Sequence, residues 1–281
     1  TLSKNIDAID DVKGFLEKSK TFNHILILEK EVEMTTKPPS PFTTLKFQQK
    51  ANQNYNMSPK ESMSIAQKLY ENGLITYMRT ESSKYSKEFC NSLKNYIEAE
   101  FGDKYIGDIE SISEQGNTPH EGIRVTNLNY DIKNENFTKK EKNIYELIRK
   151  QTMVSGMSDS KYLNMLVHIL APEDSRYSYT SKKVIFDGWK KGDKLNETES
   201  FNDYFKLLQG NVILNYNKIF SQQVENNLKR HYTYSGLLKC LQDKGIGRPS
   251  TYASIIEKNI SRGYVSLKNI DGKPVESIAL T

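Results

Sequence analysis

The sequence has few of the features that mark disulfide scaffolds, zinc ribbons or membrane proteins. Only two cysteines, Cys90 and Cys240, occur in 281 residues, and no Cys-x-x-Cys pair is present, which excludes a zinc ribbon in this chain. Both cysteines fall on apolar faces of predicted helices, so we expect two buried free thiols. The polar N-terminal stretch has no signal peptide, and no apolar run is long enough to span a membrane. We therefore expect an intracellular, reducing compartment.

A strong excess of charge of one sign is also absent, because the net charge is only +5 with 27% charged residues. A uniformly basic surface is therefore not predicted. The excess is local, since eight basic and three acidic residues lie between Tyr216 and Tyr264. Such a segment fits contact with a phosphate backbone, and a solvated lysine-rich surface has the same composition. Charge alone leaves these two interpretations open.

The first half of the chain predicts a strand followed by a block of helices. Residues 24–37 begin with His-Ile-Leu-Ile-Leu and predict a strand. The prolines at 38, 39 and 41 then break the chain, and we place a domain boundary there. Helices are expected to begin after Thr43, Ser58, Ser86 and Thr138, with capping boxes at Ser58–Glu61 and Thr138–Glu141.

The second half alternates between β-rich and helical character. Residues 162–170, 177–189 and 212–215 are β-rich, and the polar segment 193–200 predicts a loop. From residue 220 the chain is expected to be helical, at about 235–244 and 251–262, with Ser250 as the N-cap of the last helix. Because β-rich segments flank the helical block on both sides, we predict an α+β multidomain protein in which a helical insertion interrupts one β domain.

The segment Leu-Ile-Thr-Tyr-Met-Arg-Thr at residues 74–80 is the most informative part of the sequence. On an expected strand, residues two apart point to the same side, so Tyr77 and Arg79 would project together. A phenol can attack a phosphodiester, and a guanidinium can bind the non-bridging phosphate oxygens as charge builds. Taken alone, a Tyr-x-Arg pair is also compatible with an ordinary exposed strand face.

Two further segments favour the chemical interpretation. Residues 119–126 read Pro-His-Glu-Gly-Ile-Arg-Val-Thr, and residues 245–253 read Gly-Ile-Gly-Arg-Pro-Ser-Thr-Tyr-Ala, followed by Arg-Gly-Tyr-Val at 262–265. The three segments have the order and roughly the spacing of motifs in type IA DNA topoisomerases. The patterns of that family resemble I-T-Y-M-R-T-D-S, H-E-A-I-R-P-T and G-I-G-R-P-S-T-Y-A. The resemblance covers about residues 35–265, most of the chain.

The resemblance implies a reaction and a domain organisation. Members of the family join a tyrosine to the 5′ phosphate of a cut DNA strand, pass another strand through the gap and reseal the break, which relaxes negatively supercoiled DNA. Tyr77 matches that nucleophile. The implied domains are the first part of a β-rich hinge domain (1–41), a helical, helix-turn-helix-like catalytic tyrosine domain (42–156), the second part of the hinge domain (157–215) and part of a helical DNA-binding domain (216–281).

The resemblance also suggests roles for residues near Tyr77. Arg79 and His120 match family positions at the reacting phosphate, although His120 could instead be a structural histidine beside a loop. Arg248 would meet phosphate at a helix N-terminus, and the alternative there is a glycine cap followed by a new N-cap. We also expect Glu121 and Arg124 to form a salt bridge that orients their loop. The expected DNA-binding residues are Arg248, Thr251, Ser250, Arg124 and Glu81.

Three residues depart from the family pattern. Glu81 stands where aspartate is usual, which keeps the charge and lengthens the side chain by one methylene. Gly122 replaces an alanine and Val125 a proline, so we expect a looser loop at this point.

Family members also carry a Toprim domain, whose acidic residues bind Mg²⁺. No Asp-x-Asp-x-Glu pattern occurs in this chain, so we expect a fragment that holds the tyrosine side of the site, no metal site of its own, and Mg²⁺ bound by the absent domain. The expected partner is DNA, preferentially single-stranded, and no association with a membrane is expected. We expect a monomer located in the cytoplasm, nucleoid or nucleus.

The alternative is a non-enzymatic helix-turn-helix DNA-binding protein that uses Arg248, Thr251 and the basic C-terminal region alone. The combination of Tyr77, Arg79 and His120 favours the enzyme, because binding alone does not require a nucleophile. A metal hydrolase is excluded because the sequence offers no set of metal ligands.

Overall fold

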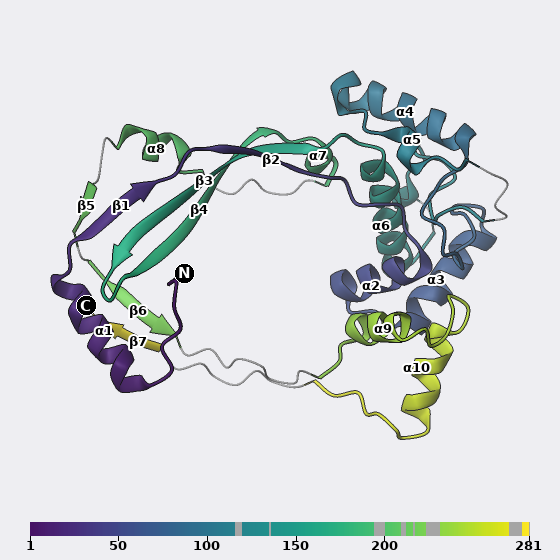
Figure 1. The fold of residues 1–281 in the computed structure, drawn as a ribbon. Helices are drawn as coiled ribbons and strands as arrows, with labels where there is room; N and C mark the ends of the chain where they lie inside the picture. The colour runs from purple at the N-terminus through teal and green to yellow at the C-terminus, as the bar shows by residue number, and fades with distance from the viewer. Residues whose placement is uncertain are drawn as a thin grey trace.

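The computed structural model is an α+β molecule in which a long antiparallel sheet leads into a block of helices (Figure 1). The structure describes residues 1–115, 120–134, 136–193, 200–208, 212–215, 217–222, 231–269 and 277–280. The helices are α1 (Ile9–Thr21), α2 (Thr44–Tyr55), α3 (Pro59–Glu71), α4 (Lys87–Phe101), α5 (Ile109–Ile112), α6 (Lys139–Ser155), α7 (Trp189–Asp193), α8 (Asn202–Leu207), α9 (Tyr234–Asp243) and α10 (Tyr252–Ser261), with 3₁₀ turns η1 (Asp103–Tyr105) and η2 (Ile132–Asn134). The strands are β1 (His24–Leu28), β2 (Val32–Thr36), β3 (Ser160–Ala171), β4 (Ser175–Phe186), β5 (Val212–Leu214), β6 (Ile219–Gln222) and β7 (Ser277–Leu280).

The main sheet is built around the long strand β3. Its neighbour β4 pairs with it along almost its whole length, from Lys161 opposite Phe186 to Ala171 opposite Ser175. Strands β1 and β2 pair with different parts of β3, and β5 extends the sheet beyond β1. The single strand predicted over residues 24–37 is therefore two strands, separated by residues 29–31.

The expected helix starts are confirmed, and their caps explain them. The side chains of Thr43, Ser58, Ser86 and Thr138 each accept a hydrogen bond from a backbone N–H in the first turn of their helix. The reciprocal capping box forms at Thr138 and Glu141. At α3 only the Ser58 half is present in the described structure, because the Glu61 carboxylate binds Lys140 instead.

Helices α2, α3, α4 and α6 share one hydrophobic core. Its fully buried side chains include Phe47, Leu69, Leu93, Tyr145 and Ile148. This core begins at Phe42 and continues to Met157, the stretch where the helical insertion was expected. None of the described helices is both long enough and apolar enough to cross a membrane.

Several sequence expectations are wrong at the level of elements. Residues 74–80 form no strand, only a single bridge between Ile75 and Val125. Residues 219–222 form β6, which pairs with β7, where helix was expected. Helix α1 was not anticipated. Cys90 is buried as expected, but Cys240 is only half-buried. The loop predicted over 193–200 lies mostly outside the described residues, as does Pro119.

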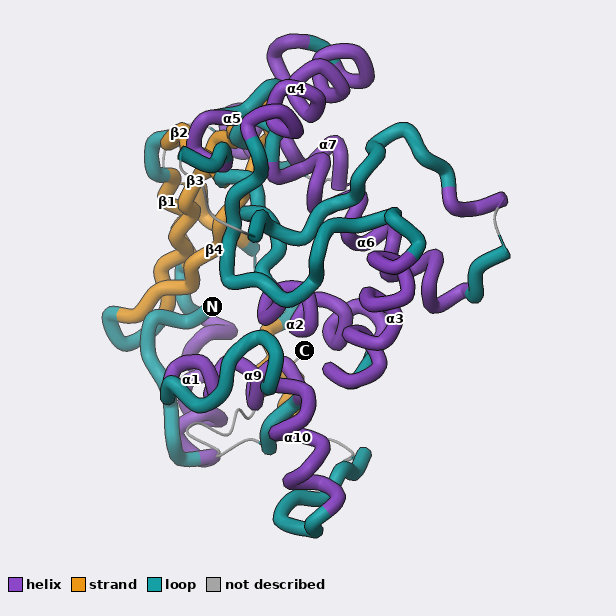
Figure 2. Tube along the Cα trace, turned by 90° about the vertical axis from the view of Figure 1, so that its right-hand side faces the viewer, coloured by secondary structure: helices purple, strands orange, loops and turns teal. Residues whose placement is uncertain are grey.

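Helices α9 and α10, which fall in the expected DNA-binding domain (216–281), dock against the helical block. Figure 2 shows them next to α2 and α3, with the strands on the far side. A small hydrophobic cluster joins Leu45 of α2 to Leu238, Tyr252 and Ile256. Polar contacts at its edge include Lys60 with Glu257 at 3.4 Å, and this docking places the loop before α10 beside Tyr77.

Candidate functional site

The segment carrying Tyr77 is fastened to the segment that follows His120. The backbone N–H of Thr76 donates to the carbonyl of Arg124 at 2.9 Å, and the Thr76 hydroxyl donates to the carbonyl of Gly122 at 2.9 Å. In return, the backbone N–H of Arg124 donates to the Thr76 hydroxyl at 3.0 Å. The two motifs are therefore held together although more than forty residues separate them in the sequence.

Buried neighbours hold the tyrosine segment in place and leave Tyr77 and Arg79 accessible. Met78 and Thr80 are buried, and the hydroxyl of buried Thr44 donates to the carbonyl of Met78 at 2.7 Å. Tyr77 is half-buried and Arg79 is exposed. Both line the same groove, so their predicted common direction holds even though the predicted strand is absent.

The ring of Tyr77 lies between two other rings. The ring of Tyr70, from the last turn of α3, meets it edge-on at 5.4 Å between centroids. The ring of His120 lies at 5.4 Å with a tilt of 37°. Aromatic contacts at this separation restrict rotation of a side chain, so they orient the Tyr77 ring from two sides.

These residues form one wall of a groove of about 500 Å³, and the loop before α10 forms the other. The groove is open to solvent and carries two arginines, Arg79 and Arg248, against one carboxylate, Glu81. This excess of positive charge suits a phosphate group. The lining residues are Tyr77, Arg79, Thr80, Glu81, Ser82, His120, Arg248, Pro249 and Ser250.

The loop before α10 is shaped by glycine and by Thr251. Gly247 has φ +86°, and a Cβ there would lie 2.8 Å from the side chain of Ile255, so glycine is required. The Thr251 hydroxyl accepts from the backbone N–H of Arg248 at 2.8 Å and closes the turn. Thr251, not Ser250, is the N-cap of α10, without a side-chain bond to the helix. Ser250 is therefore free to line the groove, whereas Thr251 shapes the loop.

Arg124 lies outside the groove lining. Its guanidinium donates twice to the Glu121 carboxylate, at 2.9 and 2.8 Å, and once to the Val125 carbonyl. Its carbon centre lies 3.8 Å from the ring centroid of Phe89. The expected salt bridge between Arg124 and Glu121 is confirmed, and it fits the expected role of this pair in orienting the loop, whereas the expected contact of Arg124 with DNA stays a prediction.

The loop around Gly122 is tightly packed, whereas a looser loop was expected from the sequence. A Cβ at this position would lie 3.2 Å from Pro41 Cβ, 3.3 Å from the Lys84 carbonyl oxygen and 3.4 Å from that of Ser82. The Gly122 N–H donates to the same Lys84 carbonyl at 2.6 Å. A small residue thus allows the backbone of residues 82–84 to approach closely.

Sequence reasoning missed four residues of the site. Tyr70 contacts Tyr77, and Thr80, Ser82 and Pro249 line the groove. All four lie in or beside the motifs, so proximity to Tyr77 and Arg248 in the sequence was the available signal. Tyr70 lies seven residues before Tyr77, and the end of α3 falls between them. A helical pattern stops at the helix end, so it does not predict that the two rings meet.

The described residues do not fit a magnesium site. No group of three or more His, Cys, Asp or Glu side chains in the described part of the chain could hold a metal ion. In the groove, Glu81 is the one carboxylate, and Mg²⁺ prefers several oxygen ligands.

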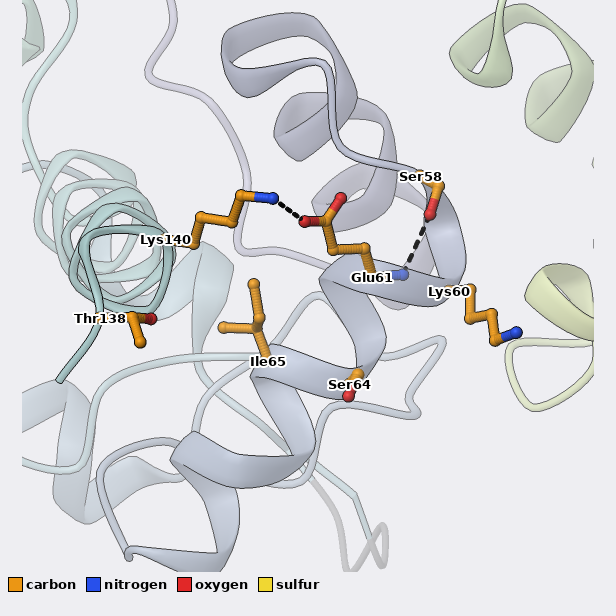
Figure 3. Close-up of a pocket in the computed structure, with 7 residues that line it drawn as sticks. All are labelled: Ser58, Lys60, Glu61, Ser64, Ile65, Thr138 and Lys140. Atoms are coloured by element: carbon orange, nitrogen blue, oxygen red, sulfur yellow. Dashed lines mark hydrogen bonds and ion pairs between the residues drawn. The ribbon is translucent and has the colours of Figure 1, made fainter. Parts of the chain in front are cut away.

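A second pocket of about 430 Å³ lies between α3 and the start of α6 (Figure 3). Lys140 reaches across it to the carboxylate of Glu61, and Ser58 caps α3 at its edge. Most of its polar side chains are thus used in caps and ion pairs, of which Lys140 with Glu61 joins the two helices and Lys60 with Glu257 reaches α10. None of the predicted site residues lines this pocket.

The comparisons with known proteins agree on one family. A family model described as DNA topoisomerase matches residues 1–277. A protein named DNA topoisomerase 1 from Buchnera aphidicola is 33% identical over 263 residues, which cover 92% of this chain and 30% of the relative. Proteins of the same name are 34% identical in Rickettsia felis, covering 95% of this chain and 37% of the relative, and 31% identical in Aquifex aeolicus, covering 95% and 49%.

A solved structure shows the same fold. The full-length topoisomerase I of Thermotoga maritima matches with a TM-score of 0.74 and 28% identity, over 94% of this chain and 44% of that chain. This chain thus spans about a third of the length of the first relatives and less than half of the solved structure.

Proposed function

The chain belongs to the type IA DNA topoisomerases, and on that premise we propose that Tyr77 is the nucleophile that cuts one DNA strand. The observation that carries this proposal is the groove in which Tyr77, Arg79 and His120 face Arg248 and Ser250. A tyrosine beside two arginines in an open groove can meet a phosphodiester from solvent. The substrate of the complete protein is DNA, bound as a single strand at the groove.

In the proposed reaction the Tyr77 hydroxyl oxygen attacks the phosphorus. The bond from phosphorus to the 3′ oxygen breaks, the 3′ hydroxyl leaves with a proton, and the 5′ phosphate becomes an ester of tyrosine. Attack by the same 3′ hydroxyl reverses the step and releases Tyr77. Because the ester conserves the energy of the phosphodiester, resealing needs no other energy source.

The remaining groove residues bind and orient in this proposal. Arg79 donates to the non-bridging oxygens of the reacting phosphate, where negative charge builds. His120 holds the Tyr77 ring through its ring contact and can donate to the same phosphate. Arg248 and Ser250 bind the strand from the opposite wall. Glu81 lies among these cations and can orient them.

The Mg²⁺ expected of the family does not fit the groove residues, so we place its ligands outside the part of the chain that the structure describes. When bound, such an ion would supply charge neutralisation at DNA phosphates. The complete protein is proposed to act as a monomer on intracellular DNA.

A helix-turn-helix protein that only binds DNA is the weaker alternative. Binding would need Arg248 and the basic C-terminal segment, but it would not need Tyr77 held between two rings. The convergence of the tyrosine, histidine and arginine segments in one groove supports the enzyme.

The test is Tyr77→Phe in the full-length parent protein. The variant should lose covalent attachment to a labelled single-stranded oligonucleotide on denaturing gels, because only the attacking oxygen is removed. Non-covalent affinity should stay within about twofold, since the hydroxyl makes no described hydrogen bond and the ring contacts remain. A covalent adduct that survives in Tyr77→Phe would refute the assignment.

A further inference from the structure

The sheet joins the helical block at a closely packed elbow formed by residues 102–107, 157–160 and 186–191 (Figure 1). The N–H of Ser158 donates to the Tyr105 carbonyl at 2.8 Å, and the N–H of Trp189 donates to the Ser158 carbonyl at 2.9 Å. Gly188 has φ +51°, and a Cβ there would lie 2.3 Å from the Asp159 carbonyl oxygen. The three segments therefore form a rigid platform, because their backbones touch.

Three lysines of this elbow and one from the adjoining strand β4 lie over aromatic rings. Lys104 and Lys191 hold their ammonium groups 5.4 and 4.9 Å from the ring centroid of Tyr105. Lys104 also lies 5.9 Å from the ring of Phe186, which is itself 5.0 Å from Tyr105.

The other two lysines share the neighbouring ring of Tyr162. The ammonium of Lys182 lies 5.3 Å from that ring centroid, and the ammonium of Lys190 lies 5.6 Å from it. Lys190 and Lys191 are neighbours in α7, so the rings of Tyr162 and Tyr105 both lie beside this short helix. We name these four residues (Lys104, Lys182, Lys190 and Lys191) the elbow lysines.

None of the elbow lysines forms an ion pair with a carboxylate in the described part of the chain, whereas many other lysines do. The Lys191 ammonium donates to the Tyr105 hydroxyl at 3.3 Å, and that hydroxyl donates to Asp187, so one elbow lysine lies near a carboxylate without bonding to it directly. Three carboxylates lie in the same segments. Asp187 accepts from the Tyr105 hydroxyl at 2.8 Å, Asp103 accepts from the backbone N–H of Lys104, and Asp159 lies beside Gly188. Cation–π contacts hold the ammonium groups in place without cancelling their charge.

We propose that the elbow lysines form a second DNA-binding surface, which contacts the sugar–phosphate backbone at a distance from the Tyr77 groove. The proposal rests on the proposed function, because DNA is the polyanion that a member of this family handles. Ammonium groups donate well to phosphate oxygens and carry no information about base identity, so the contact is made to the sugar–phosphate backbone. Binding at the elbow is therefore independent of sequence, and it keeps the DNA near the joint between sheet and helices.

The test replaces all four elbow lysines by glutamine in the 281-residue chain. Binding to a single strand of about 40 nucleotides should weaken at least tenfold at low salt. Each phosphate contact that is lost should make the slope of log K against log salt shallower by roughly 0.7. The loss of four such contacts should therefore make it shallower by about 3. An oligonucleotide of about 6 nucleotides, which fills only the groove, should bind unchanged. Replacing the four residues by arginine should preserve the slope.

The matched control removes four lysines elsewhere that are exposed and unpaired among the described residues (Lys30, Lys87, Lys94 and Lys139). The control variant loses the same net charge as the elbow variant. If its salt slope changed by the same amount, overall charge would explain the weaker binding of the elbow variant, and the proposal would be overturned. An unchanged slope in the elbow variant would also overturn it. Arg248→Ala separates the two surfaces, because it should lower the slope by about 1 for both oligonucleotides. If Arg248→Ala has no effect while the elbow variant loses binding, the groove assignment fails and the elbow proposal survives.

Discussion

At the scale of single residues, Tyr77 is positioned through its neighbours and its ring. Its hydroxyl has no hydrogen bond within the described structure, while Met78 and Thr80 on either side of Arg79 are buried and bonded to Thr44. An attacking oxygen that is already bonded to protein would have to break that bond before reaction. The contacts of the Tyr77 ring therefore orient the side chain and leave its hydroxyl oxygen available for attack on a phosphate.

Arg124 was expected both to orient its loop and to contact DNA, and its hydrogen bonds to Glu121 fit the first role. Arg124→Gln should lower the free energy of unfolding by about 2–3 kcal/mol, because Glu121 loses a charged double hydrogen bond and Phe89 loses its cation. Urea unfolding followed by Trp189 fluorescence measures this. The salt slope of oligonucleotide binding should stay as in the original chain. A stable variant with a slope lowered by about 1 would instead make Arg124 a phosphate contact.

At the scale of elements, the start of α6 is the one described helix end that carries a reciprocal capping box. Glu141 accepts from the backbone N–H of Thr138 at 2.7 Å within the capping box, and it also binds Lys68 of α3 at 2.6 Å. The Lys68 ammonium, followed by the hydrogen bonds from Thr138, outweighs desolvation and lowers the pKa of Glu141 below its ordinary value. One carboxylate thus caps α6 and joins it to α3.

This lowered pKa gives stability a defined dependence on pH. The folded state stabilises the charged carboxylate, so the contribution is complete above the ordinary pKa of about 4.5 and is lost as the pH falls through the lower folded value. Glu141→Gln should therefore cost about 1–2 kcal/mol at pH 7, and the difference should shrink as the pH falls below 4.5. Urea titrations from pH 7 to 3 test this, with exposed Glu98→Gln as control. A Glu141→Gln deficit that is constant with pH would contradict the ionic origin.

At the scale of the whole molecule, two joints of different strength connect the parts. The elbow joins the sheet to the helical block through backbone hydrogen bonds and the Trp189 side chain, whose Nε1–H donates to the Thr36 carbonyl at 3.0 Å. The docking of α9 and α10 on α2 and α3 has four buried residues in its cluster and few polar contacts. A small interface of this kind can separate while both sides stay folded. Because Arg248 and Tyr77 lie across it, its state decides whether the groove is complete.

The chain alone should not relax supercoiled plasmid, with or without Mg²⁺. Its described residues lack a set of carboxylates for the ion, and it spans about a third of the first relatives that it matches. Agarose gels of plasmid incubated with the purified chain measure this, with a full-length relative as positive control. Mg²⁺-dependent relaxation by the pure chain would show that it holds a metal site that the described residues do not reveal.

The sequence by itself determined the features that depend on neighbours within a few residues. The helix starts at Thr43, Ser58, Ser86 and Thr138 followed from side chains that bond N–H groups in the next turn. The three motifs and their order were sufficient to identify the family. The common direction of Tyr77 and Arg79 was also foreseen, because it needs only an extended backbone.

Only the tertiary structure decided which of these residues meet. Arg248 reaches the Tyr77 groove because Leu45 packs against Leu238, Tyr252 and Ile256, a contact between residues about two hundred positions apart that no local pattern contains. The pairing of β6 with β7, two short strands far apart in the sequence, escaped prediction for the same reason. Arg124 and Thr251 carry the right chemical groups for DNA, but their donors and acceptors are used by Glu121 and by the Arg248 turn. Side-chain chemistry shows what a residue can bind, and the partners that folding supplies determine what remains available for a ligand.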